Sequence, residues 1–167
     1  MDRFERIADG HSVDAFRCGN ADLDTWLIEA ALNVDRKGTA RVYVWRDERG
    51  EVVGYFAIAP HQVRREELPT GIARGSPDVV PGFLLAKLAV AESHQGQGAG
   101  ALLLAEALRT ILEAMRLGGG RVIVVDAVDD NAQNFYEHYG FRAIPEAGGR
   151  LVLKASSAAV SLGIDWP

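Results

Sequence analysis

A glycine-rich turn in the middle of the chain has the residue types and spacing that could bind an anion. It reads Gln95-Gly96-Gln97-Gly98-Ala99-Gly100 and lies between a strand-forming run that ends at Val90 and a helical pattern over Gly98–Leu117. Glycines leave successive backbone N–H groups uncovered, and the positive end of the helix dipole lies behind them. Because a simple turn does not need three glycines in five residues, the segment predicts a cradle for a phosphate or pyrophosphate.

Two common nucleotide-binding patterns do not fit this turn. A P-loop requires Lys followed by Ser or Thr after its last glycine, and this chain has Ala-Leu there. The dinucleotide fingerprint is partly matched by Gly96, Gly98 and Ala101, and Asp126 could act as a ribose-binding acid. However, Ala91–Gln95 separate the strand from the first glycine, and only about 40 residues follow Asp126. Those residues are too few for the remaining strands of such a sheet.

Two motifs resemble those of the GNAT superfamily of N-acetyltransferases. Gln95–Gly100 matches the signature Gln/Arg-x-x-Gly-x-Gly/Ala, and Ala132–Phe141 is similar to A-x-x-x-Y-x-x-x-G-F. The resemblance implies that the turn binds the pyrophosphate of acetyl-CoA and that the preceding strand pairs with pantetheine. The cofactor-binding residues that it implies are Leu88, Ala89, Val90, Gln95, Gly96, Gln97, Gly98, Ala99, Gly100, Asn131 and Phe135.

The second motif places Tyr136 near the thioester sulfur and makes it the expected catalytic residue. Many family members have Asn seven residues before this tyrosine, where Asp129 stands in this chain, and we expect Asn131 to take over that contact. A phenol with a pKa of about 10 stays protonated at neutral pH and can donate its proton to a thiolate, whose acid has a pKa of about 8.5. The alternative is that Tyr136 is simply a core aromatic residue, because Phe135, Tyr136 and Tyr139 have the sequence spacing of residues that pack together on a helix.

A narrower resemblance points to the GNAT toxins of bacterial toxin–antitoxin pairs. It is carried by Phe16–Leu27, by Val53–Ala59 and by Leu88–Gly96. It implies acetylation of the α-amino group of aminoacyl-tRNA, inhibition of translation, a small DNA-binding antitoxin as partner and a homodimer. Two alternatives remain open at this point. One is a GNAT enzyme that acetylates a small-molecule amine or a protein N-terminus, and the other is a non-catalytic protein that binds acyl-CoA.

No side chain stands out as a general base, because the four histidines are scattered along the chain. An α-amino group with a pKa of about 7.7–8.0 keeps a useful neutral fraction at cellular pH, whereas a lysine at about 10.4 does not. The missing base therefore favours an α-amine as acceptor.

The net charge of −5 argues against RNA binding over the whole surface, so a tRNA would need a local basic patch. The candidate clusters, each of which could also be ordinary solvated surface, are Arg36, Lys37 and Arg41, then Arg64, Arg65 and Arg74, then Arg142, Arg150 and Lys154. We expect Arg36, Lys37, Arg41 and Lys87 to bind the substrate. Lys87 lies within the apolar cofactor strand, where it could meet a phosphate of RNA or CoA or could simply extend its ammonium to solvent.

The elements that would position these residues follow from periodicity. Apolar residues from Leu23 to Val34 predict one amphipathic helix capped by Asn20 or Asp22, and two strand-forming runs around Asp47–Gly50 predict a β-hairpin. A long loop is expected from Pro60 to Pro81. Further on, the patterns predict strands at Phe83–Val90, Val122–Ala127 and Leu151–Ala155 and helices at Gly98–Leu117 and Asn131–Tyr139.

This order predicts one α/β domain over residues 1–167 around a mixed sheet. The family resemblance makes the expected fold GNAT-like, with a mostly antiparallel twisted sheet flanked by helices. The 167 residues are 48% apolar and 25% charged, typical of a globular protein. The single cysteine excludes an internal disulfide and a cysteine metal cluster, and no metal is expected. Met1–Arg6 lacks the pattern of a signal peptide and no stretch is apolar enough for a membrane helix, so a cytoplasmic location is expected.

Overall fold

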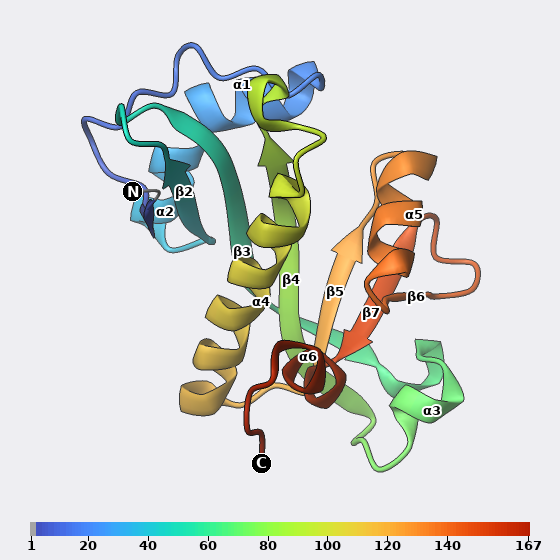
Figure 1. Ribbon diagram of the computed structural model, residues 1–167. Coiled ribbons are helices and arrows are strands. Elements are labelled where there is room, and N and C mark those ends of the chain that lie inside the picture. Colours follow the sequence, from blue (N-terminus) through green and yellow to red (C-terminus); the bar gives the residue numbers. More distant parts are fainter. Residues whose placement is uncertain (1–2) are drawn as a thin grey trace. The chain divides into compact units, whose positions relative to one another are not determined.

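The computed structural model describes residues 3–167 and has a mixed α/β architecture (Figure 1). Met1 and Asp2, part of the segment tested for a signal peptide, lie outside the described residues. The sheet has seven strands in the order β1-β2-β3-β4-β5-β7-β6. Strands β4 and β5 pair in parallel, whereas β1–β2, β2–β3, β5–β7 and β6–β7 pair antiparallel. The predicted mixed and mostly antiparallel sheet flanked by helices is confirmed.

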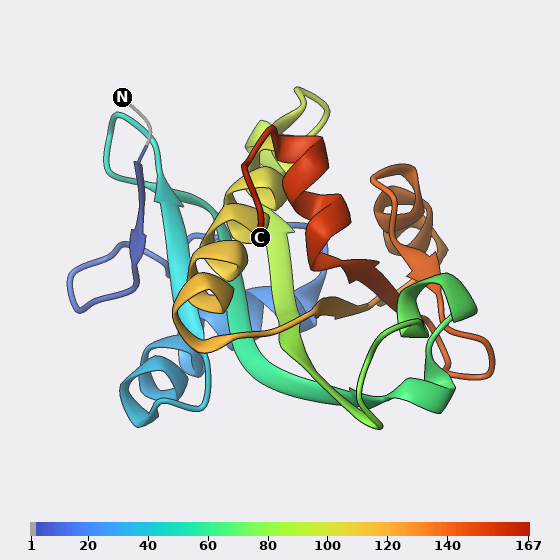
Figure 2. The same ribbon diagram turned by 90° about the horizontal axis from the view of Figure 1, so that it is seen from below.

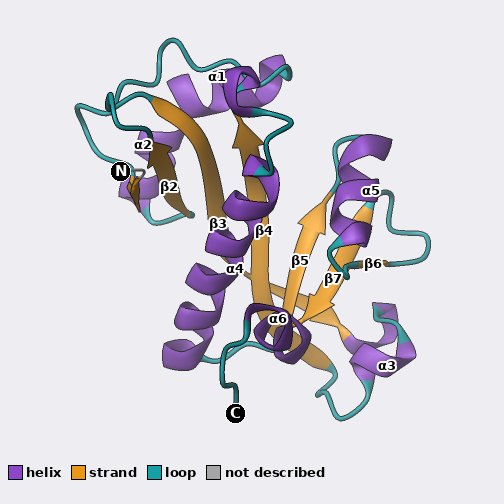
Figure 3. Cartoon of the chain, in the orientation of Figure 1, coloured by secondary structure: helices purple, strands orange, loops and turns teal. Residues whose placement is uncertain are grey.

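Figure 3 shows the strands and helices of the chain. The strands are β1 (Arg3–Arg6), β2 (Arg41–Arg46), β3 (Val52–Arg64), β4 (Val79–Val90), β5 (Val122–Asp126), β6 (Arg142–Ala143) and β7 (Arg150–Lys154). The helices are α1 (Ala21–Glu29), α2 (Ala31–Lys37), α3 (Thr70–Ala73), α4 (Ala99–Gly118), α5 (Asp130–His138) and α6 (Ala155–Leu162). Two short 3₁₀ helices are η1 (Arg65–Glu67) and η2 (Glu92–His94). None of the helices among the described residues is both long and apolar enough to cross a membrane.

Contacts divide the chain into two compact units. Unit 1 comprises Met1–Ala59 and Ala86–Ala107, and unit 2 comprises Pro60–Leu85 and Leu108–Pro167. In unit 1, β2 and β3 form the predicted hairpin, with Tyr43 opposite Phe56. The carboxylate of Asp47 accepts hydrogen bonds from the N–H groups of Arg49 and Glu51, and it thereby closes the turn.

The predicted single helix from Leu23 to Val34 is wrong, because the structure has two helices with a break at Ala30. Asn20 caps the first helix by accepting a hydrogen bond of 3.1 Å from the N–H of Leu23, as predicted. Ala30 has φ −118°, which departs from the α-helical value and ends the first helix. Its N–H still donates a hydrogen bond to the carbonyl of Trp26 in that helix. The apolar stripe does not reveal this break, because Leu27 and Ala31 are buried on either side of it.

The core of unit 2 surrounds β5, whose residues Val122–Val125 are almost completely buried. The predicted strand in this region is confirmed, and its unbroken apolar run is typical of a strand covered on both faces. Gly82 of β4 is required at the parallel pair, because a Cβ there would lie 2.3 Å from the carbonyl oxygen of Val122. The apolar cluster around this pair consists of Val63, Leu68, Ile72, Val80, Val122, Val124, Ile144 and Val152.

The expected long loop from Pro60 to Pro81 is too long. Strand β3 continues to Arg64 and β4 begins at Val79, so the irregular connection shrinks to Arg65–Asp78 and contains η1 and α3. The extension of β3 has an inward side of His61 and Val63 between exposed neighbours. Because a histidine occupies one of these inward positions, the alternation of a strand is not visible in the sequence.

Candidate functional site

The glycine-rich turn lies where the sequence predicted it, between β4 and α4 in unit 1. Gly96 has φ +78° and Gly98 has φ +76°, a left-handed backbone that favours glycine. A Cβ built on either glycine has no heavy atom within 4 Å, so the backbone of the turn faces open space.

The start of α4 supplies N–H groups to the same turn. The first helical hydrogen bond runs from the N–H of Leu102 to the carbonyl of Gly98, at 3.1 Å. The N–H groups of Ala99, Gly100 and Ala101 precede this bond, as is usual for the first turn of a helix. An open glycine backbone beside these N–H groups and the helix dipole suits a pyrophosphate, so the residues fit the diphosphate part of acetyl-CoA.

The predicted cofactor residues that precede the turn lie at the end of β4. Ala89 is buried, whereas Leu88 and Val90 are half-buried. Gln95 is exposed, and its side-chain nitrogen donates hydrogen bonds to the carbonyls of Val90 (2.8 Å) and Cys18 (2.7 Å). The amide nitrogen of Gln95 therefore has partners within the protein, and the predicted contact of Gln95 with a cofactor stays a prediction.

Tyr136 lies on α5 in unit 2 and is 8% exposed. Its ring meets those of Phe135 and Phe141 edge-on, with 5.3 Å between centroids in both cases. Burial raises the pKa of Tyr136 above its ordinary value, so the phenol holds its proton throughout the physiological range. The residue thus has both the packing and the protonation that the two interpretations of the sequence require.

The helix that carries Tyr136 also explains the aspartate that replaces the family's asparagine. The Asp129 carboxylate caps α5 by accepting a hydrogen bond of 2.8 Å from the N–H of Ala132. Asn131, the expected substitute, is exposed on the first turn of α5, and Phe135 is half-buried one turn later. The cofactor contacts of Asn131 and Phe135 stay predictions.

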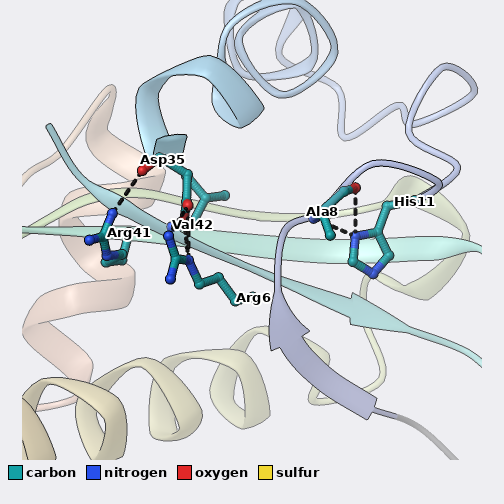
Figure 4. Close-up of polar contacts among 6 residues, drawn as sticks. All are labelled: Arg6, Ala8, His11, Asp35, Arg41 and Val42. Atoms are coloured by element: carbon teal, nitrogen blue, oxygen red, sulfur yellow. Dashed lines mark hydrogen bonds and ion pairs between the residues drawn. The ribbon is translucent and has the colours of Figure 1, made fainter. Parts of the chain in front are cut away.

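The basic cluster near the end of α2 is used largely within the protein (Figure 4). Arg41 donates to the carbonyl of Asp35 at 2.7 Å, and the Asp35 carboxylate binds the guanidinium of Arg6 at 2.7 Å and the N–H of Val42 at 3.0 Å. Burial alone would raise the pKa of Asp35, but these hydrogen bonds and the charge of Arg6 outweigh it and lower the pKa.

Two other members of that cluster lie at the last turn of α2. Arg36 forms an ion pair with Asp9, whereas Lys37 is exposed. Both arginines of this cluster, Arg36 and Arg41, thus already have partners within the protein, and the substrate contacts of Arg36, Lys37 and Arg41 stay predictions.

Lys87 contacts an aromatic ring in unit 1. Its ammonium lies 5.4 Å from the centroid of the Trp26 ring, and that ring stacks on Tyr55 with 5.9 Å between centroids. A cation over an indole is stabilised by the ring quadrupole. This contact gives Lys87 a partner within the protein, and its predicted contact with a phosphate stays untested.

Three of the remaining candidate cations, all in unit 2, also form ion pairs within the protein. Arg64 pairs with Glu66 at 2.8 Å, and Arg65 pairs with Asp78 at 2.6 Å. Arg150 binds Asp126 through two parallel hydrogen bonds of 2.8 and 2.9 Å. Asp126 is therefore engaged in an ion pair within the protein.

The described histidines contact different partners, and His94 Nδ1 lies 2.9 Å from the hydroxyl of its neighbour Ser93. His61 Nε2 lies 3.3 Å from a nitrogen of Arg150, and burial together with that charge lowers the pKa of His61. His11 contacts Glu5 at 2.8 Å. In the part of the chain from residue 3 onward, no group of three or more His, Cys, Asp or Glu side chains could hold a metal ion.

Sequence reasoning missed the part that Cys18 and Asp24 play beside the turn. The Cys18 carbonyl accepts the hydrogen bond from Gln95, and its N–H donates to the buried Asp24 at 2.8 Å. The bond between Gln95 and Cys18 joins residues 77 positions apart and uses a backbone carbonyl, which every residue type has. The bond between Cys18 and Asp24 joins residues 6 positions apart. The only signal in the sequence was Asp24, a carboxylate on the inner side of the predicted helix.

Comparison with known proteins places this geometry in a family. The family model of the acetyltransferase (GNAT) domain matches residues 38–143. The tRNA-acetylating toxin of Mycobacterium tuberculosis is 36% identical over 159 residues, which cover 95% of each chain. Among solved structures, a tyrosine-to-phenylalanine mutant of KacT is 26% identical with a TM-score of 0.88, covering 96% of this chain and 98% of that one. AtaT in complex with acetyl-methionyl-tRNA is 25% identical with a TM-score of 0.88, covering 96% and 99%. The chain therefore belongs to the GNAT acetyltransferase family.

Proposed function

We propose that residues 1–167 act as a single acetyltransferase domain that transfers the acetyl group of acetyl-CoA to the α-amino group of aminoacyl-tRNA. By this reaction the protein would act as a toxin that inhibits translation. The observation that carries the proposal is the 36% identity, over 95% of the chain, to a protein named for acetylating tRNA. A fold that matches AtaT bound to acetyl-methionyl-tRNA supports the same acceptor.

Acetyl-CoA supplies the thioester that is broken, and the glycine-rich turn is the part of this chain that fits its pyrophosphate. Gly96 and Gly98 leave the backbone open, and the N–H groups at the start of α4 are oriented by the helix. We assign Leu88, Ala89 and Val90 at the end of β4 to pantetheine. These residues hold and orient the donor and do not themselves react.

Tyr136 supplies the proton in this proposal. Acyl transfer from a thioester to an amine needs a neutral nucleophile and an acid for the leaving thiolate. The buried phenol of Tyr136, whose pKa is raised, holds a proton on Oη at every pH at which the enzyme would work. The α-amine is partly neutral without help from a base, because its pKa is about 7.7–8.0.

The tRNA is proposed to bind through a restricted set of cations. The chain has a net charge of −5, and Arg36, Arg65 and Arg150 are paired with carboxylates. Lys37 at the end of α2 is exposed and is the member of its cluster best placed to meet a phosphate. A small basic footprint predicts a modest dependence of binding on salt, equivalent to a few phosphate contacts.

The proposal includes the setting of a toxin. We propose a small DNA-binding antitoxin as partner, a homodimer as assembly and the cytoplasm, where aminoacyl-tRNA is used, as location. Inspection of the neighbouring open reading frame tests the antitoxin, and sedimentation of the purified protein tests the dimer.

The experiment that tests the acceptor uses labelled acetyl-CoA and bulk aminoacyl-tRNA. We expect mass spectrometry to find N-acetyl-aminoacyl-tRNA, and Tyr136→Phe protein in parallel should form little of it. Efficient acetylation of a polyamine or a peptide N-terminus, with no acetylated tRNA, would reject the toxin and leave an acetyltransferase with another acceptor. Binding of acetyl-CoA without transfer to any amine would favour a non-catalytic protein.

A further inference from the structure

Gln95 has a structural role that its place in the cofactor signature does not reveal. Its side-chain amide nitrogen donates to the carbonyl of Val90 at the end of β4 and to the carbonyl of Cys18, 77 residues earlier. Both hydrogens of the amide are thereby used. We call the segment Arg17–Asn20, which leads into α1, the N-terminal strap.

Two backbone N–H groups complete the attachment of the strap. The N–H of Glu92 donates to the carbonyl of Arg17 at 2.8 Å, and the N–H of Cys18 donates to the carboxylate of Asp24 at 2.8 Å. Asp24 lies on α1 and is 8% exposed. The strap is therefore bonded on one side to the segment that leads into the glycine-rich turn and on the other side to α1.

We infer that Gln95 is a positioning residue whose side chain couples the N-terminal strap to the glycine-rich turn, so that the turn keeps its acetyl-CoA-binding shape only while the strap is docked. The inference rests on the proposed binding of acetyl-CoA at this turn. Its physical basis is conformational entropy, because Gly96 and Gly98 have the most freedom to lose when the turn becomes ordered. A docked strap removes part of that cost before the ligand arrives.

Reciprocity follows from this coupling. If docking of the strap favours acetyl-CoA, then acetyl-CoA must favour docking of the strap by the same factor. Cys18 is a built-in probe of that docking. Burial and the hydrogen bond with Asp24 raise the pKa of Cys18 from 9.0 to about 11, so its thiol reacts slowly while the strap is docked.

The pKa of Cys18 determines how much its labelling rate should change when the strap is released. A thiol that returned to its ordinary pKa of 9.0 would have roughly 100-fold more thiolate at pH 8 than one at about 11. The lower basicity makes each thiolate less nucleophilic, which leaves a gain of about 10-fold in the rate of labelling. This gain is the effect of the change in pKa alone for a fully released strap.

The test compares Gln95→Met, which keeps the length but removes both donors, with Gln95→Arg, which keeps donors. Gln97→Met is the matched control for the labelling, because Gln97 is exposed in the same turn. We expect Gln95→Met to bind acetyl-CoA about 10-fold more weakly by calorimetry, as for two lost hydrogen bonds, and to label faster at Cys18. Gln95→Arg should restore much of both properties, and Gln97→Met should label like the wild type.

A second variant tests the coupling from outside the turn. Asp24→Ala releases the strap from α1 while it leaves Gln95 intact, and we expect it to weaken acetyl-CoA binding as well. Acetyl-CoA should slow the labelling of Cys18 in the wild type and protect it less in Gln95→Met.

The outcomes separate the inference from the proposed function. Weaker binding by Gln95→Met with unchanged labelling would mean that Gln95 touches the ligand directly, and it would overturn the inference. Unchanged affinity in folded Asp24→Ala protein would do the same. A wild-type protein that does not bind acetyl-CoA at all would instead refute the proposed function.

Discussion

Replacement of Tyr136 by phenylalanine separates its packing role from its chemical role. The ring contacts with Phe135 and Phe141, each at 5.3 Å, do not involve the hydroxyl and are retained. We therefore expect the free energy of unfolding to change by less than about 1.5 kcal/mol, the contribution of one hydrogen bond. Turnover should fall by about 10²–10⁴-fold, because a general acid is lost, which corresponds to about 2.7–5.5 kcal/mol in the activation barrier.

The pH dependence of the wild type provides an independent check on the same residue. Burial raises the pKa of Tyr136 above 10.0, so its ionisation should cause no loss of rate below about pH 10. The rate should rise with pH between about 6 and 8, as the acceptor α-amine loses its proton. Because the folded-state pKa is the higher one, the stabilisation from the neutral phenol is complete below pH 10 and is lost as the pH rises above it.

The assay is single-turnover acetylation of charged tRNA, with acetyl-CoA affinity measured separately by calorimetry. Affinity should be nearly the same in Tyr136→Phe and wild-type protein. If the variant keeps the full turnover number with its authentic acceptor, Tyr136 is a packing residue and the proton must come from elsewhere. A decline in the wild-type rate between pH 8 and 9 that is absent from the variant would contradict the raised pKa.

Three further perturbations address other parts of the protein. Gly98→Val should abolish acetyl-CoA binding in calorimetry, whereas Gly50→Val, which has a similar positive φ and equally open surroundings in a hairpin turn, should carry the same strain and still bind. Asp35→Ala should lower the free energy of unfolding by about 3 kcal/mol in urea denaturation, because the N–H of Val42 and the guanidinium of Arg6 lose their buried partner. In the wild type the lowered pKa of Asp35 means that this stabilisation is present above pH 3.8 and is lost as the pH falls further, and no acid sensitivity from this site should remain in the variant. Lys87→Met should reduce the salt dependence of tRNA binding by about one phosphate contact if Lys87 meets the RNA, and an unchanged slope would assign Lys87 to its aromatic contact alone.

Local chemistry explains what could be predicted from the sequence. The cap at Asn20, the hairpin turn at Asp47 and the left-handed positions at Gly96 and Gly98 all depend on residues within a few positions of one another. The buried β5 was predictable for a similar reason, because an unbroken apolar run can only lie inside. For these features the residue type and the structure are directly linked.

The features that escaped prediction depend on distant partners. The ion pair between Arg6 and Asp35 joins residues 29 apart and links β1 to α2, both of which contact β2. The break at Ala30 changes one backbone angle without changing the apolar stripe. His61, at an inward position of β3, contacts Arg150 of β7, which lies 89 residues further along the chain. Periodicity carries no information about such pairs, and family resemblance names motifs and not their internal partners.

The edges of the sheet determine how further chains could associate with it. An exposed edge strand presents unpaired N–H and C=O groups and can template the addition of another strand. Here one edge is β1, a strand of four residues beside β2 (Figure 2) that contains Arg3, Glu5 and Arg6, and the other is β6, with only two residues. Short, charged edges disfavour the pairing of strands between molecules. We therefore expect the proposed antitoxin to be recognised by side chains on helices and loops and not by backbone pairing at these edges.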